Sequence, residues 1–277
     1  MHTTPPDRYA VIGNPIAQAR SPRIHALFAQ QTGQHIDFGR IECSDAEFVP
    51  TVRAFAAAGG RGMSVTAPFK IRAFELADDA SARATSAGAV NALRFDAGRI
   101  RAENFDGLGL VNDIRRNLGV ALAGRRVLLL GAGGAARGAL LPLLAERPAQ
   151  LVIANRNPAR AQELERAFAP QGPVRGCPFA DLGGMRFDVV LNATSASLQD
   201  VPPDVPEGVF DGVLLAYELV YGKGLTPFLR AARAAGAARL ADGTGMVVEQ
   251  GAEAFLWWRG VRPQTAPVIE ALRTPLD

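Results

Sequence analysis

The chain has 277 residues, of which 48% are hydrophobic and 21% charged, a composition typical of globular proteins and unlike that of disordered ones. Its length suggests about two domains. The 30 basic and 27 acidic side chains leave a formal charge of only +3, which gives no indication of a nucleic-acid partner. The sequence contains no run of about 18 apolar residues, so we expect no membrane partner either.

The cysteines and histidines argue against a disulfide scaffold and against a metal site. Cys43 and Cys177 lie far apart and belong to no redox or metal-binding spacing. His2, His25 and His35 form none of the paired arrangements that bind metals. We therefore expect no bound metal and a reducing, cytoplasmic location.

Strand and helix patterns alternate in the first third of the chain. Strands are expected at 9–12, 36–41 and 62–65. Helices are expected at 22–31, with a proline in the first turn, and at 45–57, with Asp45 as the N-cap. This alternation predicts βα units and a mainly parallel sheet.

A second series of elements begins after Asp106, with a helix expected over 107–118 that ends at Gly119. Strands are expected at 127–130, 151–154, 188–191 and 213–217, and helices at 134–145, 158–169 and 226–235. This order is typical of a dinucleotide-binding domain. The helices expected at 246–258 and 267–272 are not needed by that domain, so we expect them to pack on the N-terminal one.

The strongest local signal is a glycine-rich turn after the expected strand 127–130. It reads Gly131-Ala132-Gly133-Gly134-Ala135-Ala136 and fits the pattern GxGxxA. Small residues there let the backbone approach a pyrophosphate, and the amino end of the next helix stabilises its negative charge. The alternative is a tight turn of the kind found in any α/β protein, but the strand–turn–helix context favours dinucleotide binding.

The end of the next expected strand favours NADP over NAD. NAD-binding domains carry an acidic residue about 20 residues after the glycine-rich turn, where it holds the ribose 2′-hydroxyl. Here the strand ends in Asn155-Arg156-Asn157, with Arg160 one helical turn later. A guanidinium group suits a 2′-phosphate, with which it forms charge-assisted hydrogen bonds. The alternative is a pair of solvated surface arginines.

Lys70 is the main candidate for proton transfer. No tyrosine is followed by a lysine four residues later, so the Tyr–Lys pair of short-chain dehydrogenases is absent. The only lysines are Lys70 and Lys223. A lysine beside a carboxylate can give a proton to a developing alkoxide and take it back in the reverse reaction. Two alternatives stay open: Lys70 as a surface charge, and Asp106 as the N-cap of the helix after it.

Short motifs follow one another along nearly the whole chain. The first are Gly13-Asn14-Pro15-Ile16, Ser21-Pro22-Arg23-Ile24-His25, 65–70 (VTAPFK), 88–91 (GAVN) and Asp106-Gly107. The later ones are 131–136 (GAGGAA), Asn155-Arg156, 192–195 (NATS), Tyr221 with Thr226-Pro227, 242–246 (DGTGM) and 250–252 (QGA). In these motifs and their spacing the sequence resembles the shikimate dehydrogenase family.

The resemblance implies an α/β protein with two α/β domains and an active site in the cleft between them. Residues 1–106 and 241–277 would form a substrate domain with a mainly parallel sheet, and 107–240 a Rossmann-type NADP-binding domain. The implied activity is the NADP-dependent interconversion of 3-dehydroshikimate and shikimate, a step of aromatic amino-acid biosynthesis.

The resemblance also assigns roles to individual residues. Lys70 would be the acid–base group and Asp106 its carboxylate partner. The substrate would be bound by Ser21, Thr66, Asn91, Tyr221 and Gln250. The cofactor would contact Gly131, Ala132, Gly133, Gly134, Ala135, Asn155, Arg156, Asn157, Arg160, Thr194, Leu219 and Gly243.

Four positions depart from the motifs that the family usually has. Ala19 replaces one of two serines that hold the substrate carboxylate. Ser64, Ala92 and Phe105 replace an asparagine and two threonines, and Phe105 is expected to add bulk beside Asp106. The changes suggest either a different cyclic hydroxy acid as substrate, such as quinate or an aminoshikimate, or drift without effect.

The alternative from another functional class is a catalytically weak NADP-binding sensor. The presence of both Lys70 and Asp106 disfavours it, because a sensor needs no proton donor. We therefore expect an enzyme that acts on a small molecule as a monomer or homodimer.

Overall fold

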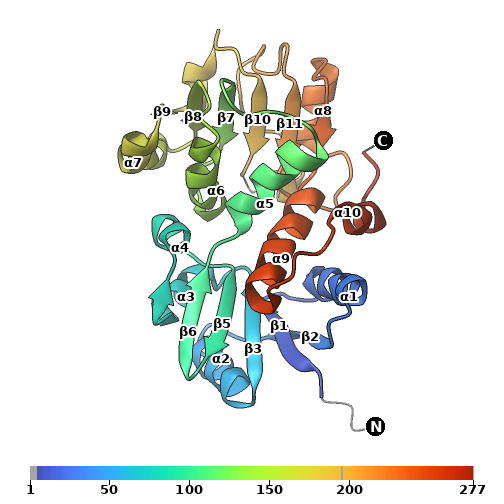
Figure 1. The fold of residues 1–277 in the computed structure, drawn as a ribbon. Coiled ribbons are helices and arrows are strands. Elements are labelled where there is room, and N and C mark those ends of the chain that lie inside the picture. Colours follow the sequence, from blue (N-terminus) through green and yellow to red (C-terminus); the bar gives the residue numbers. More distant parts are fainter. Residues whose placement is uncertain (1–4, 195, 277) are drawn as a thin grey trace. The chain divides into compact units, whose positions relative to one another are not determined.

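The structure, a computed structural model, describes residues 5–194 and 196–276, so Ser195 of the NATS motif lies outside the described residues. The chain forms two compact units (Figure 1). Unit 1 comprises Met1–Gly109 and Val248–Glu270, and unit 2 comprises Leu110–Val247 and Ala271–Asp277. Each unit has its own six-stranded sheet. The predicted α/β fold with two sheets is confirmed.

The sheet of unit 1 is mainly parallel, as predicted. Its strand order is β2-β1-β3-β5-β6-β4, and only β5 runs antiparallel to its neighbours. The strands are β1 (Asp7–Gly13), β2 (Ile36–Glu42), β3 (Gly60–Val65), β4 (Asp79–Ala80), β5 (Ala92–Asp96) and β6 (Arg99–Glu103). The β5–β6 hairpin turns through Ala97 and Gly98, both with positive φ, as a two-residue hairpin loop requires.

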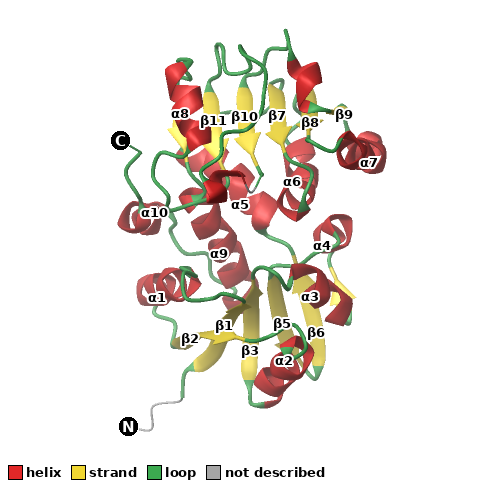
Figure 2. Ribbon diagram, turned by 180° about the vertical axis from the view of Figure 1, so that it is seen from behind, coloured by secondary structure: helices red, strands yellow, loops and turns green. Residues whose placement is uncertain are grey.

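The helices of unit 1 cover both faces of this sheet. One face packs on α2 (Phe48–Ala57), α3 (Lys70–Leu76) and α4 (Ala82–Ala87), as Figure 2 shows. The other face packs on α1 (Ser21–Thr32) and on α9 (Thr244–Arg259) from Val248 onward. A further helix, α10, spans Ala266–Leu272.

Asp45 is not an N-cap, contrary to prediction. Helix α2 begins three residues later, at Phe48, after Glu47 in the capping position. The carboxylate of Glu47 accepts hydrogen bonds from the backbone and hydroxyl of Ser44, so residues 44–47 form a turn before the helix. Asp45 instead pairs with Arg72 of α3.

The sheet of unit 2 is entirely parallel, in the order β12-β11-β10-β7-β8-β9. Its strands are β7 (Arg126–Leu130), β8 (Gln150–Ala154), β9 (Val174–Cys177), β10 (Val189–Asn192), β11 (Leu215–Glu218) and β12 (Leu240–Ala241). The chain order reverses between β7 and β10, which is the Rossmann pattern, and ligands bind at the carboxyl ends of strands beside such a point.

Helices cover both faces of the second sheet. They are the end of α5 (Asp106–Asn112), α6 (Gly134–Ala145), α7 (Pro158–Phe168) and α8 (Pro227–Ala234), with short 3₁₀ segments at Ala169–Gln171, Phe179–Leu182 and Ala196–Gln199. A single helix is predicted over 107–118. The structure differs from this prediction, because α5 ends at Asn112 and the chain continues as a π-helical turn, Asp113–Asn117. At its start the buried Asp113 accepts hydrogen bonds from the Tyr217 hydroxyl (2.7 Å) and from Asn117 (2.9 Å). No described helix is long and apolar enough to cross a membrane.

Candidate active site

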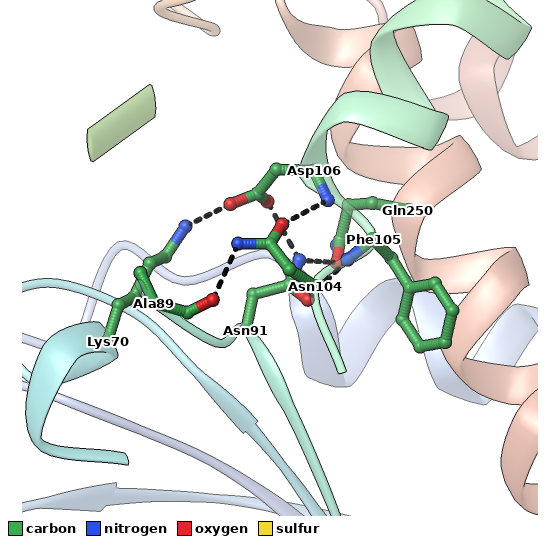
Figure 3. A network of polar contacts seen from close by, with 7 residues as sticks. All are labelled: Lys70, Ala89, Asn91, Asn104, Phe105, Asp106 and Gln250. Carbon is green, nitrogen blue, oxygen red and sulfur yellow. Dashed lines mark hydrogen bonds and ion pairs between the residues drawn. The ribbon is translucent and has the colours of Figure 1, made fainter. Parts of the chain in front are cut away.

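Lys70 and Asp106 form an ion pair in unit 1, with the Lys70 Nζ donating to Asp106 Oδ2 at 2.5 Å (Figure 3). Lys70 is the first residue of α3, and Asp106 the first of α5. The residue before the lysine, Phe69, is fully buried against Phe48 at 4.7 Å between ring centres, which fixes where α3 begins. The lysine side chain is 34% exposed and that of Asp106 14%, so the ammonium group is held in place yet accessible.

Asn91 connects the ion pair to a further amide from α9. Its Nδ2 donates to Asp106 Oδ1 at 2.8 Å and to Gln250 Oε1 at 3.1 Å. Its Oδ1 accepts the backbone N–H of Phe105 at 2.9 Å, which fixes the orientation of the amide. The structure thus brings four predicted residues, Lys70, Asp106, Asn91 and Gln250, into one hydrogen-bonded group (Figure 3).

Asn104 also belongs to this group, although the sequence pattern predicts no role for it. Its Oδ1 accepts the N–H of Asp106 at 3.1 Å, and its Nδ2 donates to the carbonyl of Ala89 at 2.9 Å. The first N–H of α5 is therefore bound by Asn104, and both Asp106 carboxylate oxygens bind side chains. The sequence feature that could have predicted this role is an asparagine two residues before the first residue of a helix, because its side chain readily binds the backbone N–H at that spacing.

The Phe105 ring does not lie beside the ion pair, contrary to expectation. It is 4% exposed and packs in an apolar cluster with Ala92 and Ala254. Its ring centre lies 5.9 Å from that of Trp257, and Figure 3 shows it directed away from Lys70. Backbone geometry accounts for this, because the Phe105 N–H points to Asn91 while the next residue, Asp106, carries the carboxylate that binds Lys70.

The two other substrate-binding residues predicted in unit 1 are Ser21 and Thr66. Ser21 is the first residue of α1, and Thr66 follows β3. A Cβ added to Gly13 would lie 2.4 Å from the Thr66 methyl group, so this glycine makes room for the threonine. Within residues 5–194 and 196–276, no hydrogen bond joins either side chain to Lys70, Asn91 or Asp106.

A cavity of about 730 Å³ opens in unit 2 where the carboxyl ends of β7, β8 and β10 meet. It is lined by Gly131, Ala132, Gly133, Gly134, Ala135, Asn155, Arg156, Asn157, Arg160, Phe179, Ala193, Thr194, Ala196, Val201, Pro202, Pro203 and Asp204. A Cβ added at Gly133 or Gly134 would meet no atom within 4 Å, so open space lies at the start of α6. That space fits a pyrophosphate at the helix N-terminus.

Two exposed arginines, Arg156 and Arg160, lie at the same cavity. Neither forms an ion pair with any other described residue, so both guanidinium groups can receive an anion. Asn157 accepts the N–H of Ala159 at 3.1 Å as the N-cap of α7, and Asn155 donates to the Asn157 carbonyl at 2.9 Å. This turn fits the 2′-phosphate of NADP better than the 2′-hydroxyl of NAD.

Leu219 and Gly243 lie close together, and neither lines the cavity. A Cβ at Gly243 would lie 2.1 Å from the Leu219 carbonyl oxygen, so only glycine permits this approach. The Gly243 N–H also donates a hydrogen bond, at 3.2 Å, to the carbonyl of Val220, the residue after Leu219. Tyr221 follows in the same loop. Phe179 and 201–204, which line the cavity, carried no sequence signal because they follow no predicted strand.

Comparison with known proteins identifies the family. The shikimate dehydrogenase substrate binding domain matches residues 11–93, shikimate / quinate 5-dehydrogenase matches 113–203, and the shikimate 5'-dehydrogenase C-terminal domain matches 243–273. A shikimate dehydrogenase (NADP(+)) from Nitrosospira multiformis is 56% identical over 270 residues, 98% of each chain. The chain belongs to the shikimate dehydrogenase family. Another relative of the same name, from Aromatoleum aromaticum, is 55% identical over 98% of each chain.

Solved structures of similar proteins have the same fold. The Ael1 enzyme from Pseudomonas putida is 58% identical in sequence and superposes with a TM-score of 0.95. The match covers 98% of this chain and 100% of the Ael1 chain. Shikimate 5-dehydrogenase from Thermus thermophilus, solved in complex with NADP(H) and shikimate, is 30% identical with a TM-score of 0.86, over 96% of this chain and 98% of its own.

Proposed function

We propose that the chain is an NADP-dependent oxidoreductase that interconverts 3-dehydroshikimate and shikimate. The Lys70–Asp106 ion pair carries this proposal, because it supplies a held, accessible proton donor. Relatives at 56% and 55% identity over nearly the full chain bear the name shikimate dehydrogenase (NADP(+)), which supports the same activity and cofactor.

The proposed reaction assigns the proton step to Lys70. Bound NADPH supplies a hydride to the ketone carbon of 3-dehydroshikimate. The Lys70 ammonium gives its proton to the oxygen of that ketone as negative charge develops on it. Asp106 keeps the ammonium in place and accepts a hydrogen bond from the reacting hydroxyl. In the reverse direction neutral Lys70 takes the hydroxyl proton back.

Further residues are proposed to bind the two ligands. Ser21, Thr66, Asn91, Tyr221 and Gln250 would hold the ring hydroxyls and the carboxylate of the substrate. The residues from Gly131 to Ala135 would bind the pyrophosphate, and Asn155, Arg156, Asn157 and Arg160 the 2′-phosphate, with Thr194, Leu219 and Gly243 towards the nicotinamide. Residues 1–106 and 241–277 would thus form the substrate domain, and 107–240 the NADP domain.

A panel of substrates tests the activity directly. Shikimate, quinate and their dehydro forms are each supplied with NADP and with NAD, and the absorbance of the reduced cofactor is followed. We expect the fastest reaction with shikimate and NADP. Binding of NADP without turnover of any substrate would instead indicate the sensor.

A paralogue acting on a related acid, such as quinate or an aminoshikimate, is the second candidate. Ala19 supports it, because this 8% exposed residue packs its methyl group with Val11 and Ile16 where the family uses a serine hydroxyl for the substrate carboxylate. Ala19→Ser should then strengthen shikimate binding by about 1 kcal/mol, the size of one hydrogen bond. A low micromolar wild-type Michaelis constant for shikimate would dismiss this candidate.

Two further proposals concern the location and the assembly of the protein. Both cysteines are buried free thiols, which suits a reducing, cytoplasmic setting. A monomer or homodimer is proposed, and ultracentrifugation would decide between them.

A further inference from the structure

Glu218 is a fully buried carboxylate at the end of β11, surrounded by neutral donors. Its Oε2 accepts hydrogen bonds from Asn192 (3.0 Å), Thr226 (3.1 Å) and Ser197, and its Oε1 accepts the N–H of Val220 at 3.3 Å. No described lysine or arginine pairs with it. Burying a carboxylate with no cationic partner is costly, and its hydrogen bonds to neutral donors offset part of that cost.

One of these hydrogen bonds leads to the cofactor cavity. Asn192 lies directly opposite Glu218 in the β10–β11 ladder and donates its Nδ2 to the carboxylate. Its Oδ1 then faces Thr194 and accepts both the N–H (3.1 Å) and the hydroxyl (2.8 Å) of that residue. Thr194 lines the cavity and packs against Gly131, whose added Cβ would lie 3.3 Å from the Thr194 methyl group. The Glu218 carboxylate therefore accepts from the Asn192 Nδ2, which leaves the Asn192 Oδ1 to accept from Thr194.

A second hydrogen bond leads to the loop that carries Tyr221. The Val220 N–H, one residue before the tyrosine, donates to Glu218. The Gly222 N–H, one residue after it, donates to Asp242 at 3.0 Å. Tyr221 is thus bracketed by two anchored peptide groups. The loop is also bound to Asn192, the partner of Glu218, because the N–H of Leu219 donates to the backbone carbonyl of Asn192 at 3.0 Å.

We propose that Glu218 is a positioning residue that holds two ligand-binding loops, 192–194 through Asn192 and 219–222 through the N–H of Val220. The inference rests on the proposed function, from which the ligands of Thr194, Leu219 and Tyr221 come. Glu218 is fully buried and does not line the cofactor cavity. Its two carboxylate oxygens accept hydrogen bonds from both loops at once. A glutamine amide at this position would have only one acceptor oxygen, because its other terminal atom is a donor nitrogen.

Exchanging the acid and the amide provides the test. In Glu218→Gln the new amide nitrogen faces groups that are themselves hydrogen-bond donors, so a hydrogen bond is lost. In Asn192→Asp the carboxylates of residues 192 and 218 lie side by side and repel each other. In the double variant the carboxylate at 192 still accepts from Thr194, while the glutamine can donate to it and accept from Val220. We expect each single variant to bind NADP⁺ about tenfold more weakly and to show a raised shikimate Michaelis constant, and the double variant to return to within about threefold of wild type.

Thr226→Val is the matched control, because it removes a hydrogen bond to the same carboxylate together with the N-cap of α8. It should lower the melting temperature as much as Glu218→Gln does and leave both ligands bound within about twofold of wild type. Calorimetric titration with NADP⁺, shikimate kinetics and thermal unfolding are measured for all variants. Equal ligand losses in Thr226→Val at equal stability, wild-type affinity in both single variants, or no recovery in the double variant would overturn the inference.

Asn192→Ser extends the test if Glu218→Gln does not fold. It cuts the link to Thr194 and leaves the bond from Val220 to Glu218, so NADP⁺ should bind more weakly while the shikimate Michaelis constant stays unchanged. A change in both constants, or in neither, would contradict the proposed coupling. A wild-type protein that binds no NADP⁺ overturns the proposed function and this inference together, whereas unaltered variants of an active wild type overturn only the inference.

Discussion

Phe105 packs in one buried apolar cluster with Ala92, and the two residues are 4% and 1% exposed. Ser64 lies directly opposite Ala92 in the β3–β5 ladder, so its side chain points to the same face of the sheet. Three of the four departures from the family's motifs are therefore neighbours in the packing beneath α9. We expect a large ring at 105 to leave room only for a small residue at 92, so that these two changes depend on each other.

A double-mutant cycle measures this interdependence. Phe105→Thr leaves a cavity and should cost about 3 kcal/mol of unfolding free energy. Ala92→Thr overfills the cluster and should cost about 1–3 kcal/mol. In the double variant the added threonine occupies part of the cavity, so the loss should be at least about 1 kcal/mol smaller than the sum. Urea unfolding gives the values, and additivity within about 0.5 kcal/mol would show that the two side chains do not share space.

Lys70→Ala removes the proposed proton donor. Turnover should fall by roughly 10²–10⁴-fold, the usual contribution of general acid–base catalysis, with only a modest change in the Michaelis constant. Arg72→Ala is the control, because this cation lies in the same helix but pairs with Asp45. Steady-state kinetics with shikimate and NADP decide the matter. Near-normal turnover of the Lys70 variant would exclude the lysine as acid–base group.

Arg156→Asp reverses the charge at the proposed 2′-phosphate site. It should weaken NADP binding and spare NAD, because only NADP carries the phosphate that the guanidinium would bind. Arg166→Asp makes the same charge change at an exposed position of α7 outside the cavity and should leave the ratio of the two affinities unchanged. Titration with both cofactors tests this. A wild type that binds NAD as tightly as NADP would refute the proposed preference.

Periodic, buried elements were predictable from the sequence, whereas short ones were not. The strands of unit 2 are continuous apolar runs because both faces of that sheet are covered, so β7 and β8 were predicted to within one residue. The β5–β6 hairpin was missed because its turn uses Ala97, an uncommon residue at positive φ. Helices α3 and α4 are too short to show a period.

The site divides in the same way. The glycine-rich turn and Arg156 follow directly from local patterns, since their chemistry depends on neighbours in the sequence. Asn192 and Glu218 were not assigned roles, because their pairing depends on two parallel strands meeting in register. The orientation of Phe105 was likewise beyond the sequence, as it depends on Ala254 of α9.

His25 lies in an aromatic cluster of unit 1, where its ring stacks on Phe38 at 4.2 Å between centres and meets Phe28, Phe255 and Trp258. It is 1% exposed, and its Nδ1 has no hydrogen-bond partner among the described residues. Burial lowers the pKa of His25 from 6.5 to about 3, because the charged imidazolium would lose its water in this apolar site.

This burial predicts a loss of stability in mild acid. The folded state prefers neutral His25, so its contribution is complete above pH 6.5 and is lost as the pH falls from 6.5 towards 3. Between pH 7 and pH 5 the unfolding free energy should fall by about 2 kcal/mol from this group alone. His25→Phe keeps an aromatic ring in the cluster and removes the titration, so urea unfolding of the variant should depend on pH less by that amount. Other acids titrate equally in both proteins and cancel in the comparison. Parallel pH profiles for wild type and variant would show that His25 does not control acid stability.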